Sequence, residues 1–448
     1  MPLTEIRLHN FKCFADSGPI PVAPLTVIFG RNNTGKSSIL QSLLLLRQSL
    51  DSPEFGPRLS LRGPLYPAGG YADIVHQHRS KQHLMMEFGV EVGDRGWHAT
   101  VELEFCSDEP QPPRLTRLRV SRRGGSTSDA EPLEIRRGRG AGGPYELVIG
   151  KDSLGGEKRA NFLFPVNRFL PVIGPELPRV GRPSSRRGFT RHYSNAILQE
   201  LERILRQLRA VGAFRRQPDR RYEFQGRAPE TVDAAGENVV NALIEDATRR
   251  RHRGELLHSV NQWLKAVGRV RLMPLRRISR TARIFEVRLR DTDSGRWANF
   301  ADVGFGVGQA FPVFVEGLRT PQEGTFLVQE PEIHLHPDAQ LAMGDFLVDL
   351  ARSGKRVIAE THSEHLLLRI RHLIVGKGNG RQSRFHLRPE DVSIVYVEKR
   401  PDGTSHGKHL ALDDLGQIKN WPADFMEEAT RERMAIMRAM ARRVEGTE

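Results

Sequence analysis

Cysteine is scarce in this chain, and its apolar runs are short. Cys13 and Cys106 are the only cysteines among 448 residues, which argues against a disulfide scaffold or a cysteine-based zinc site and fits a reducing compartment. No apolar run approaches the ~20 residues that a membrane-spanning helix needs. Residues 1–14 alternate charged and apolar side chains without a signal-peptide core, so we expect a cytoplasmic location and no membrane contact.

Positive charge is concentrated in the middle of the chain. The formal net charge is +14, but residues 111–290 hold 38 Lys and Arg against 18 Asp and Glu, a net of +20, whereas the remainder has a net of −6. Arginine predominates in this segment, and its guanidinium binds phosphate in bidentate geometry. One interpretation is a nucleic-acid-binding surface. The alternative is a solvated, arginine-rich surface that reflects compositional bias.

Residues Gly30–Ser37 match the phosphate-binding loop pattern G-x-x-x-x-G-K-[ST]. An apolar, β-branched stretch at 25–29 predicts a buried parallel strand before it, and residues 38–46 predict an apolar helix after it. A helix N-terminus preceded by glycines directs backbone N–H groups toward one anion. We expect Lys36 to reach the β- and γ-phosphates of a nucleotide and the Ser37 hydroxyl to bind Mg²⁺. The expected nucleotide-binding residues are Gly30, Asn32, Asn33, Thr34, Gly35, Lys36, Ser37 and Ser38.

The remaining sequence predicts alternating elements of both kinds. Period-2 patterns at 84–92 and 100–105 predict antiparallel strands, whereas residues 107–144, rich in Pro, Gly, Ser and Arg, are expected to be loops. Helical spacing recurs at 195–208 and at about 237–267. Strand-like composition returns at 283–300. Residues 325–328, 339–351 and 357–359 then predict strand, helix and strand.

Two strand ends in the second half carry residues suited to phosphoryl chemistry. Glu330 follows an apolar strand, where a carboxylate can act as general base toward a water that attacks a phosphate. His362 follows the next strand, where an imidazole can hydrogen-bond to a γ-phosphate oxygen or to that water. The simpler alternative for Glu330 is a surface carboxylate at the end of a strand. The simpler alternative for His362 is a place in a segment that only caps a helix.

The order of these motifs resembles that of a known group of ATPases. Asn10, Phe11 and Phe14, the phosphate loop, Glu-Pro-Glu-x-x-x-His-Pro at 330–337 and Thr-His-Ser at 361–363 look like the ABC-type heads of proteins related to SMC, RecF and RecN. Within that group the chain is most similar to stand-alone AAA family ATPases near the OLD and Septu families, associated with phage defence and mobile elements. Residues 302–309 and 421–425 add to this resemblance, which covers about residues 1–50 and 296–428.

The resemblance implies a role for each matching position. Glu330 would be the catalytic glutamate, His362 the switch histidine, and residues 332–337 a loop that touches a second subunit. Residues 305–309 would stand for the ABC signature and contact the γ-phosphate held by the partner, through Gly306, Gly308 and Gln309. ATP would thus be sandwiched in a homodimer, with Mg²⁺ held by Ser37 and Gln329. Lys12 would lie near the adenine side, although an ordinary surface lysine is the simpler interpretation.

Two positions depart from the pattern of that group. Gln329 stands where an aspartate is usual, and a neutral amide binds Mg²⁺ more weakly than a carboxylate, so hydrolysis is expected to be slow. Gly306 stands where many relatives carry serine, which removes one hydroxyl donor to the γ-phosphate. A zinc clamp at His334 and His336 is a further alternative, as is loop packing with a dimer contact.

The sequence therefore predicts an α/β, P-loop NTPase with an ABC-type head, a mixed sheet plus an antiparallel β subdomain, and an inserted, largely helical basic subdomain. The expected divisions are 1–110, the basic insertion 111–290 with a helical arm at about 190–268, and 291–448. The expected function is ATP hydrolysis coupled to control of DNA binding or of a nuclease or toxin effector, in anti-phage defence. A RecF-like repair ATPase and a nucleotide-binding sensor with little turnover are the alternatives. An intrinsic nuclease is disfavoured because Glu398, Asp413 and Asp414 lack the Asp-x-Asp spacing of Toprim domains.

Overall fold

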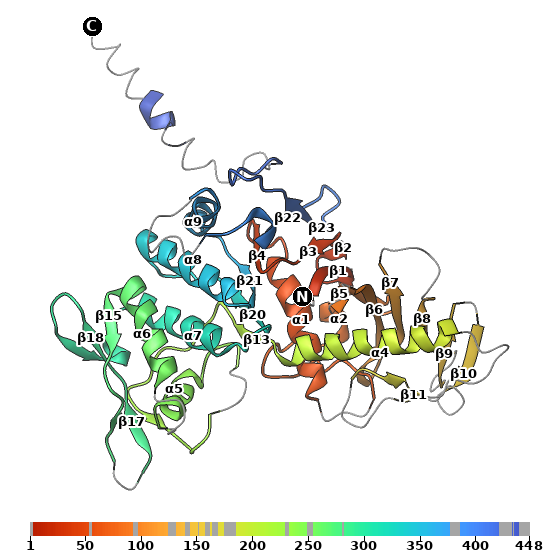
Figure 1. Cartoon of the computed structure of the whole chain (residues 1–448), viewed down its shortest axis with the longest axis horizontal. Helices are drawn as coiled ribbons and strands as arrows, with labels where there is room; N and C mark the ends of the chain where they lie inside the picture. Colours follow the sequence, from red (N-terminus) through yellow and green to blue (C-terminus); the bar gives the residue numbers. More distant parts are fainter. Residues whose placement is uncertain are drawn as a thin grey trace.

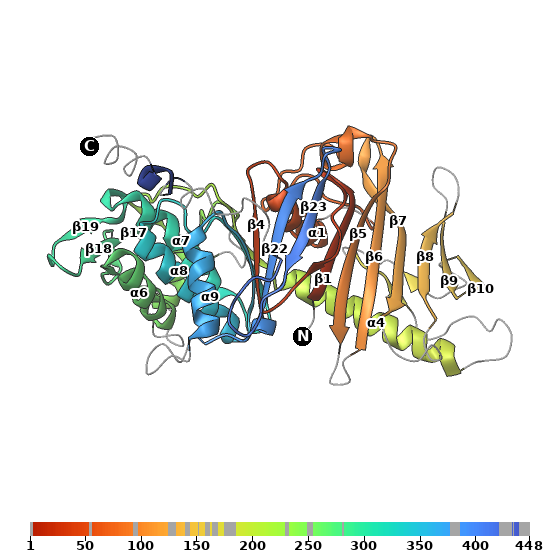
Figure 2. The ribbon, with the colours of Figure 1, turned by 90° about the horizontal axis from the view of Figure 1, so that it is seen from above.

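The computed structural model describes two β-sheets, several short strand groups and eight α-helices (Figures 1 and 2). The residues described are 3–52, 56–92, 97–123, 131–138, 144–150, 152–156, 162–163, 169–173, 185–228, 233–248, 254–279, 282–376, 386–420, 432 and 434–438. Residues 421–425, which contribute to the resemblance, lie outside this set. None of the helices in the described part of the chain is long and apolar enough to cross a membrane.

A six-stranded sheet in the order β13-β20-β21-β4-β22-β23 forms the centre of the molecule. All neighbours are parallel except β22 and β23. The central strands are buried on both faces, as expected for parallel strands covered by helices. The bounds are β13 (Arg209–Val211), β20 (Thr325–Gln329), β21 (Arg356–Glu360), β4 (Leu25–Gly30), β22 (Val392–Lys399) and β23 (Ser405–Leu410).

A nine-stranded antiparallel sheet lies beside the first, in the order β10-β9-β8-β7-β6-β5-β1-β2, with β3 paired to β1 (Figure 2). The Ser405 N–H donates to the Cys13 carbonyl at 3.0 Å and the Gly407 N–H to the Ser17 carbonyl at 2.8 Å, so β23 joins the two sheets. The bounds are β1 (Leu3–Phe11), β2 (Phe14–Asp16), β3 (Ile20–Pro21), β5 (Leu84–Val92), β6 (Trp97–Asp108), β7 (Gln111–Arg122), β8 (Leu133–Arg137), β9 (Tyr145–Ile149) and β10 (Asp152–Gly156).

The expectation of loops at 107–144 is wrong, because β7 and β8 lie there. Leu115, Leu118 and Val120 are buried at 0–1% exposure, and the arginines between them occupy the opposite face. Leu118 and Val120 follow the period-2 alternation of a half-buried strand, and a register shift between Leu115 and Arg117 keeps Leu115 on the same buried face. Proline, glycine and arginine content suggested a loop, although the alternation around Leu118 was present in the sequence.

Helices cover both faces of the parallel sheet and divide the interior into two cores. One core lies between the antiparallel sheet, α1 and α4, and receives Ile28, Leu327 and Ile358 from the parallel strands. The other lies under α5 to α9 and receives the alternate residues Val27, Phe326 and Val357. The bounds are α1 (Lys36–Leu50), α2 (Tyr71–Ile74), α4 (Ser185–Arg206), α5 (Val239–Thr248), α6 (Glu255–Gly268), α7 (Phe305–Arg319), α8 (Pro337–Arg352) and α9 (Glu364–Val375).

Residues 111–290, expected as one insertion, are distributed over both cores. Strands β7 to β10 extend the antiparallel sheet and α4 runs along it, while β13 is an edge strand of the parallel sheet (Figures 1 and 2). The remaining strands form three small groups beside these elements. They are β11 (Phe162–Leu163) with β12 (Val172–Ile173), β14 (Tyr222–Glu223) with β17 (Ile284–Glu286) and β16 (Arg276–Arg277), and β15 (Val270–Leu272) with β18 (Arg288–Asp291) and β19 (Trp297–Asn299).

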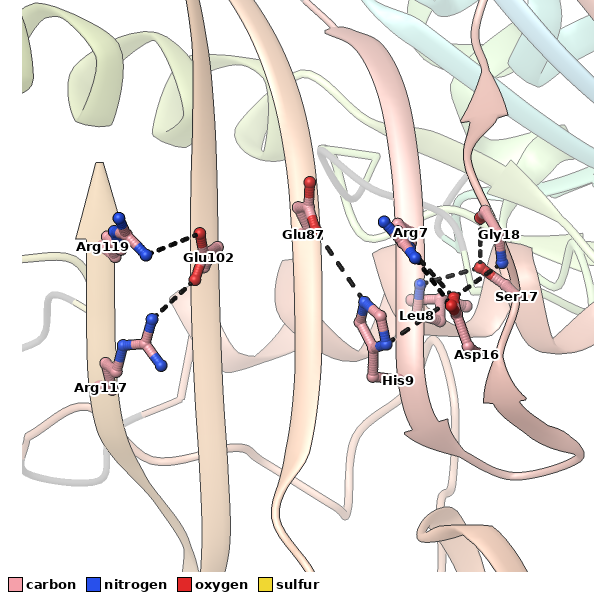
Figure 3. Close-up of polar contacts among 10 residues, drawn as sticks. All are labelled: Arg7, Leu8, His9, Asp16, Ser17, Gly18, Glu87, Glu102, Arg117 and Arg119. Atoms are coloured by element: carbon pink, nitrogen blue, oxygen red, sulfur yellow. Dashed lines mark hydrogen bonds and ion pairs between the residues drawn. The ribbon is translucent and has the colours of Figure 1, made fainter. Parts of the chain in front are cut away.

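Charged side chains on the open face of the antiparallel sheet are paired across the strands (Figure 3). Arg117 and Arg119 on β7 both reach Glu102 on β6, at 3.0 and 3.8 Å. Arg7 on β1 donates to Asp16 at 2.7 and 3.0 Å, and the guanidinium of Arg7 is the main cause that lowers the pKa of Asp16 to about 2. Arg117 and Arg119 of β7 are therefore balanced by neighbouring carboxylates.

Candidate functional site

The phosphate loop joins β4 to α1 through two glycines that no other residue can replace without strain. Gly30 has a φ of 155°, and a Cβ there would lie 2.3 Å from the Val397 carbonyl oxygen. Gly35 has a φ of 98° and precedes α1, and its Cβ would lie 2.0 Å from Cys13 Sγ. The Thr34 hydroxyl donates to the Arg31 carbonyl at 2.9 Å. The loop is thus closed on itself, with the N-terminus of α1 placed to bind an anion.

Lys36 is held against the loop that it follows. Its Nζ donates to the Arg31 carbonyl at 2.9 Å, and the residue is 4% exposed. Burial lowers the pKa of Lys36, while the carboxylates of Glu360 and Glu330 act in the opposite direction. The expected phosphate-binding amine therefore lies at the loop and close to both carboxylates. Asn32 and Asn33 on the loop are exposed.

Two parallel strands, β20 and β21, end at one level beside this loop, next to β4, which continues to Gly30. Gln329, the last residue of β20, is opposite Glu360, the last of β21, and Glu360 is opposite Ile28 of β4. The Ser37 hydroxyl donates to Glu360 Oε1 at 2.6 Å, and Gln329 Nε2 donates to Glu360 Oε2 at 2.7 Å. Burial raises the pKa of Glu360, and these two hydrogen bonds oppose the shift. Sequence reasoning assigned Ser37 and Gln329 to the metal and missed Glu360, which lies directly between them.

Glu330 and His362 face each other across the same edge. His362 Nε2 lies 3.9 Å from Glu330 Oε1, and the two side chains are 36% and 31% exposed. Glu330 has a left-handed φ of 44°, and its N–H donates to the Glu360 carbonyl at 2.7 Å. Burial and then Lys36 lower the pKa of His362, so its imidazole is neutral at neutral pH. The arrangement places a carboxylate and an imidazole beside the phosphate loop.

Glu332 stabilises the segment that carries His362. It is 7% exposed, and its Oε1 accepts from the Thr361 hydroxyl at 2.5 Å and from the His362 N–H at 2.9 Å. Burial raises the pKa of Glu332, and these hydrogen bonds oppose the shift. Glu332 therefore points into its own subunit. The 332–337 loop is expected to contact a second subunit, and its exposed part begins at His334.

His334 and His336 make different contacts. His334 has a φ of 61°, and its ring packs edge-on against Phe305 with centroids 4.6 Å apart. His336 is the N-cap of α8, and its Nδ1 accepts from the Asp338 N–H at 3.4 Å. Within the described residues no group of three His, Cys, Asp or Glu side chains could hold a metal ion.

The segment expected to act as a signature forms the first turn of α7. A Cβ on Gly306 would lie 2.5 Å from the His334 carbonyl oxygen, so serine cannot fit there without a backbone shift. Gln309 is 3% exposed, and its Nε2 donates to the Arg215 carbonyl at 3.2 Å. The Gln309 side chain therefore points into its own subunit. A Cβ on Gly304 would meet no atom within 4 Å, so the start of α7 is open on that side.

Arg215 connects the signature-like turn to the end of β20. This side chain is 6% exposed and donates to four carbonyl oxygens: Gly212 at 2.9 Å, Gln309 at 3.0 Å, Gln329 at 2.5 Å and Glu330 at 3.0 Å. Burial lowers the pKa of Arg215 to about 10, so it stays charged at neutral pH. Sequence reasoning missed Arg215, because it is one of many arginines in the basic segment.

A pocket of about 320 Å³ adjoins the phosphate loop. Lys12 and Cys13 line it from the turn between β1 and β2, Asn33 and Gly35 from the loop, and Ser38 from α1. Four further residues complete the lining: Asp73, Val75, Gln77 and His78. Lys12 Nζ donates to Gln41 Oε1 at 2.6 Å and lies 4.9 Å from the centre of the Tyr66 ring. The stretch around Lys12, expected near the base of a nucleotide, therefore forms one wall of a pocket beside the phosphate site.

Family models match three parts of the chain. The model "AAA ATPase domain" matches residues 1–86, and "AAA domain, putative AbiEii toxin, Type IV TA system" matches residues 178–369. A third, "Protein of unknown function (DUF3696)", matches residues 387–436. No curated protein sequence matches the chain. The two ATPase models include the phosphate loop and the β20–β21 edge, and they support an ATP-binding ATPase.

Solved structures of SMC heads are similar to the chain at low identity. The SMC head domain from Thermotoga maritima aligns with 12% identity and a TM-score of 0.39, over 92% of this chain and 99% of that one. An Smc head bound to the C-winged helix domain of ScpA aligns with 11% identity and a TM-score of 0.45, over 92% of this chain and 98% of that one. An Smc head with an extended coiled coil, bound to the C-terminal domain of ScpA from Pyrococcus furiosus, aligns with 10% identity and a TM-score of 0.42. The alignment covers 92% of this chain and 97% of that one. All three similarities have TM-scores below 0.5.

Replacing Arg215 by methionine should destabilise the fold and the site together. The change keeps a buried apolar stem but removes the hydrogen bonds that the guanidinium donates to the carbonyls of Gln309, Gln329 and Glu330, and a hydrogen bond from a charged group contributes about 1.5–3 kcal/mol. We expect a free energy of unfolding lower by roughly 2–4 kcal/mol in urea titrations. Arg216→Met is the matched control, because Arg216 is exposed and ion-paired with Glu237, and its loss should change that value by less than about 1 kcal/mol. Equal stability of Arg215→Met and wild type would contradict this role.

Proposed function

We propose that the chain is an ATPase that hydrolyses ATP to ADP and phosphate, with Glu330 as the general base. The observation that carries the proposal is the convergence of the phosphate loop, Glu330 and His362 at one sheet edge, with His362 Nε2 3.9 Å from Glu330 Oε1. Lys36 would neutralise charge on the β- and γ-phosphates, and the Glu330 carboxylate would accept the proton of the attacking water. The neutral His362 imidazole would hydrogen-bond to the γ-phosphate or to that water.

The chemistry of the side chains at this edge fits Mg²⁺. Ser37 and Glu360 present oxygen atoms, and hard divalent cations prefer oxygen ligands. Mg²⁺, when bound with ATP, supplies positive charge to the phosphates. A Mg²⁺ ion shared with a nucleotide is commonly held by one or two protein groups and the phosphates, which agrees with the few protein donors at this edge.

Two copies of the chain would close around ATP. The open first turn of α7 supports this part of the proposal, because the first N–H groups of a helix lack acceptors within it. Phe305 at that turn is 45% exposed and Phe214, next to Arg215, is 94% exposed. Exposed aromatic side chains are enriched at protein contacts. The backbone of Gly306 would then meet the γ-phosphate held by the partner subunit, whereas Gly308, also expected there, is buried and its N–H donates to the Gly304 carbonyl at 3.5 Å.

The biological setting is proposed from the family description. The model that matches residues 178–369 names a toxin of a Type IV toxin–antitoxin system, which supports control of a toxin or nuclease effector in phage defence, as in OLD- and Septu-like ATPases. RecF-like repair is the alternative setting. A sensor with little turnover is the second candidate function, and Gln329 in place of an aspartate favours it.

DNA would contact a cluster of arginines beside the start of α7. Arg220, Arg221, Arg276 and Arg288 line a pocket of about 470 Å³ that contains one carboxylate, Glu286. Arg220 also binds Asp302, three residues before α7 begins. A net positive pocket suits a phosphodiester, and its position beside the nucleotide-dependent turn supports coupling between ATP and DNA. Arg276 and Arg288 share the single carboxylate of Glu286, so the pocket keeps a net positive charge. Arg117 and Arg119 of β7 instead face three carboxylates, Glu102, Glu104 and Glu134.

Lys36→Ala should weaken ATP binding by roughly 10- to 100-fold, because charge-assisted hydrogen bonds contribute about 1.5–3 kcal/mol. Titration with a fluorescent ATP analogue measures the change. Lys81→Ala, at an exposed lysine far from the loop in sequence, should bind ATP like the wild type. An unchanged affinity of Lys36→Ala would contradict the phosphate site.

Glu330→Gln should keep ATP bound while steady-state phosphate release falls by about 100-fold or more, the usual contribution of a positioned base. Light scattering after gel filtration should find an ATP-dependent dimer of this variant, and the double variant with Lys36→Ala should stay monomeric. Wild-type turnover by Glu330→Gln would reject the base. Negligible release by the wild type itself, with and without DNA, would favour the sensor.

The triple variant Arg220→Ala, Arg221→Ala, Arg276→Ala should bind duplex DNA more weakly. The slope of log K against log salt should fall in magnitude by about 2–3, because each lost phosphate contact changes it by about 0.9. Fluorescence anisotropy across a salt series gives both values. Arg117→Ala with Arg119→Ala is the control and should leave the slope within about 1. Equal loss in both variants would refute a local DNA site.

A further inference from the structure

The position that normally supplies a carboxylate to Mg²⁺ in this class of site is occupied by the amide of Gln329. The adjoining strand provides a carboxylate at the same level. Glu360 ends β21, which lies between β20 and β4, and it pairs with Gln329 in register. Because β21 is the direct neighbour of the phosphate-loop strand, Glu360 is one strand closer to the loop than Gln329.

The hydrogen bonds of Glu360 tie it to both elements of a nucleotide-metal site. Oε1 accepts from the Ser37 hydroxyl at 2.6 Å, and Oε2 accepts from Gln329 Nε2 at 2.7 Å. Glu360 is 3% exposed, so this carboxylate is fixed at the loop and not free to move in solvent. Its two oxygens are thus oriented by one residue of the loop and one residue of β20.

We propose that Glu360, together with Ser37, is the protein carboxylate that holds the Mg²⁺ of bound Mg-ATP, and that Gln329 positions Glu360. This assignment rests on the proposed ATP site. Compared with the usual arrangement, the metal-binding carboxylate stands at the end of β21 instead of β20. The amide at the end of β20 supports it by a hydrogen bond. The amide at position 329 then does not by itself imply a weak metal site.

The competing interpretation is that Glu360 only joins β20, β21 and α1. The two interpretations differ in what Glu360→Gln changes. This substitution keeps the size of the side chain, and the Gln329 amide can rotate to present its oxygen to the new amide. A purely structural role therefore predicts altered stability with unchanged metal binding, whereas a metal-binding role predicts the reverse.

Binding of Mn²⁺ in place of Mg²⁺ tests the proposal without relying on turnover. Electron paramagnetic resonance counts free Mn²⁺ in the presence of full-length protein and a non-hydrolysable ATP analogue. Glu360→Gln should weaken protein-dependent Mn²⁺ binding at least about tenfold, and Gln329→Ala, which removes only the amide that positions Glu360, should weaken it less than Glu360→Gln does. Lys81→Ala, at an exposed lysine, is the control and should bind Mn²⁺ like the wild type. Thermal melting confirms that each variant is folded. Should Glu360→Gln fail to fold, Glu360→Asp, which keeps the charge but withdraws it from Ser37, should still weaken Mn²⁺ binding.

Binding of the fluorescent ATP analogue in EDTA separates this proposal from the previous one. If the wild type binds the analogue in EDTA and Mn²⁺ affinity is the same in Glu360→Gln, or in Glu360→Asp where that variant is needed, the role of Glu360 is refuted and the ATP site stands. If Gln329→Ala abolishes Mn²⁺ binding and the Glu360 variants do not, the metal belongs to Gln329. If the wild type binds no analogue with or without metal, the proposed ATPase itself fails.

Discussion

Strands β4, β21 and β20 run parallel, β20 and β21 end at one level opposite Ile28 of β4, and the candidate site depends on this register. Gln329, Glu360 and Ile28 are neighbours across the sheet, so the residues that follow each strand emerge beside the phosphate loop. A shift of one residue would turn Glu360 to the opposite face and remove it from Ser37. The alternate burial of Val27 and Ile28 in two different cores opposes such a shift, because it would exchange the side chains of both cores.

The same register accounts for the strained backbone around the site. Glu330 and His334 have positive φ angles, which are unfavourable for residues with a side chain. The Glu330 N–H is held by the Glu360 carbonyl, and the Glu332 carboxylate holds the Thr361–His362 segment. Fixed hydrogen bonds from the neighbouring strand therefore impose the turn that presents Glu330 and His362 toward each other.

The local parts of the site could be predicted from the sequence, and the non-local parts could not. The phosphate loop, β4, α1, β20, α8 and β21 follow from contiguous patterns. The roles of Glu360 and Arg215 depend on which strands become neighbours and which carbonyls converge, and neither is written in the residues beside them. The prediction of loops at 107–144 was wrong because it gave the Pro, Gly, Ser and Arg content more weight than the alternation of apolar residues. From the sequence, Gly306 meant only the loss of a serine hydroxyl. The structure gives the reason for glycine at this position, because a Cβ there would lie 2.5 Å from the His334 carbonyl oxygen.

The guanidinium of Arg215 binds carbonyls of both the α7 turn and the end of β20. In a dimer closed over two ATP molecules, the α7 turn of one subunit belongs to one active site and the end of β20 belongs to the other. A single side chain then links the two reaction centres in each subunit, so a change at one is passed to the other through about three hydrogen bonds. Such an enzyme would bind its two ATP molecules cooperatively, and its turnover would follow a sigmoidal dependence on ATP concentration.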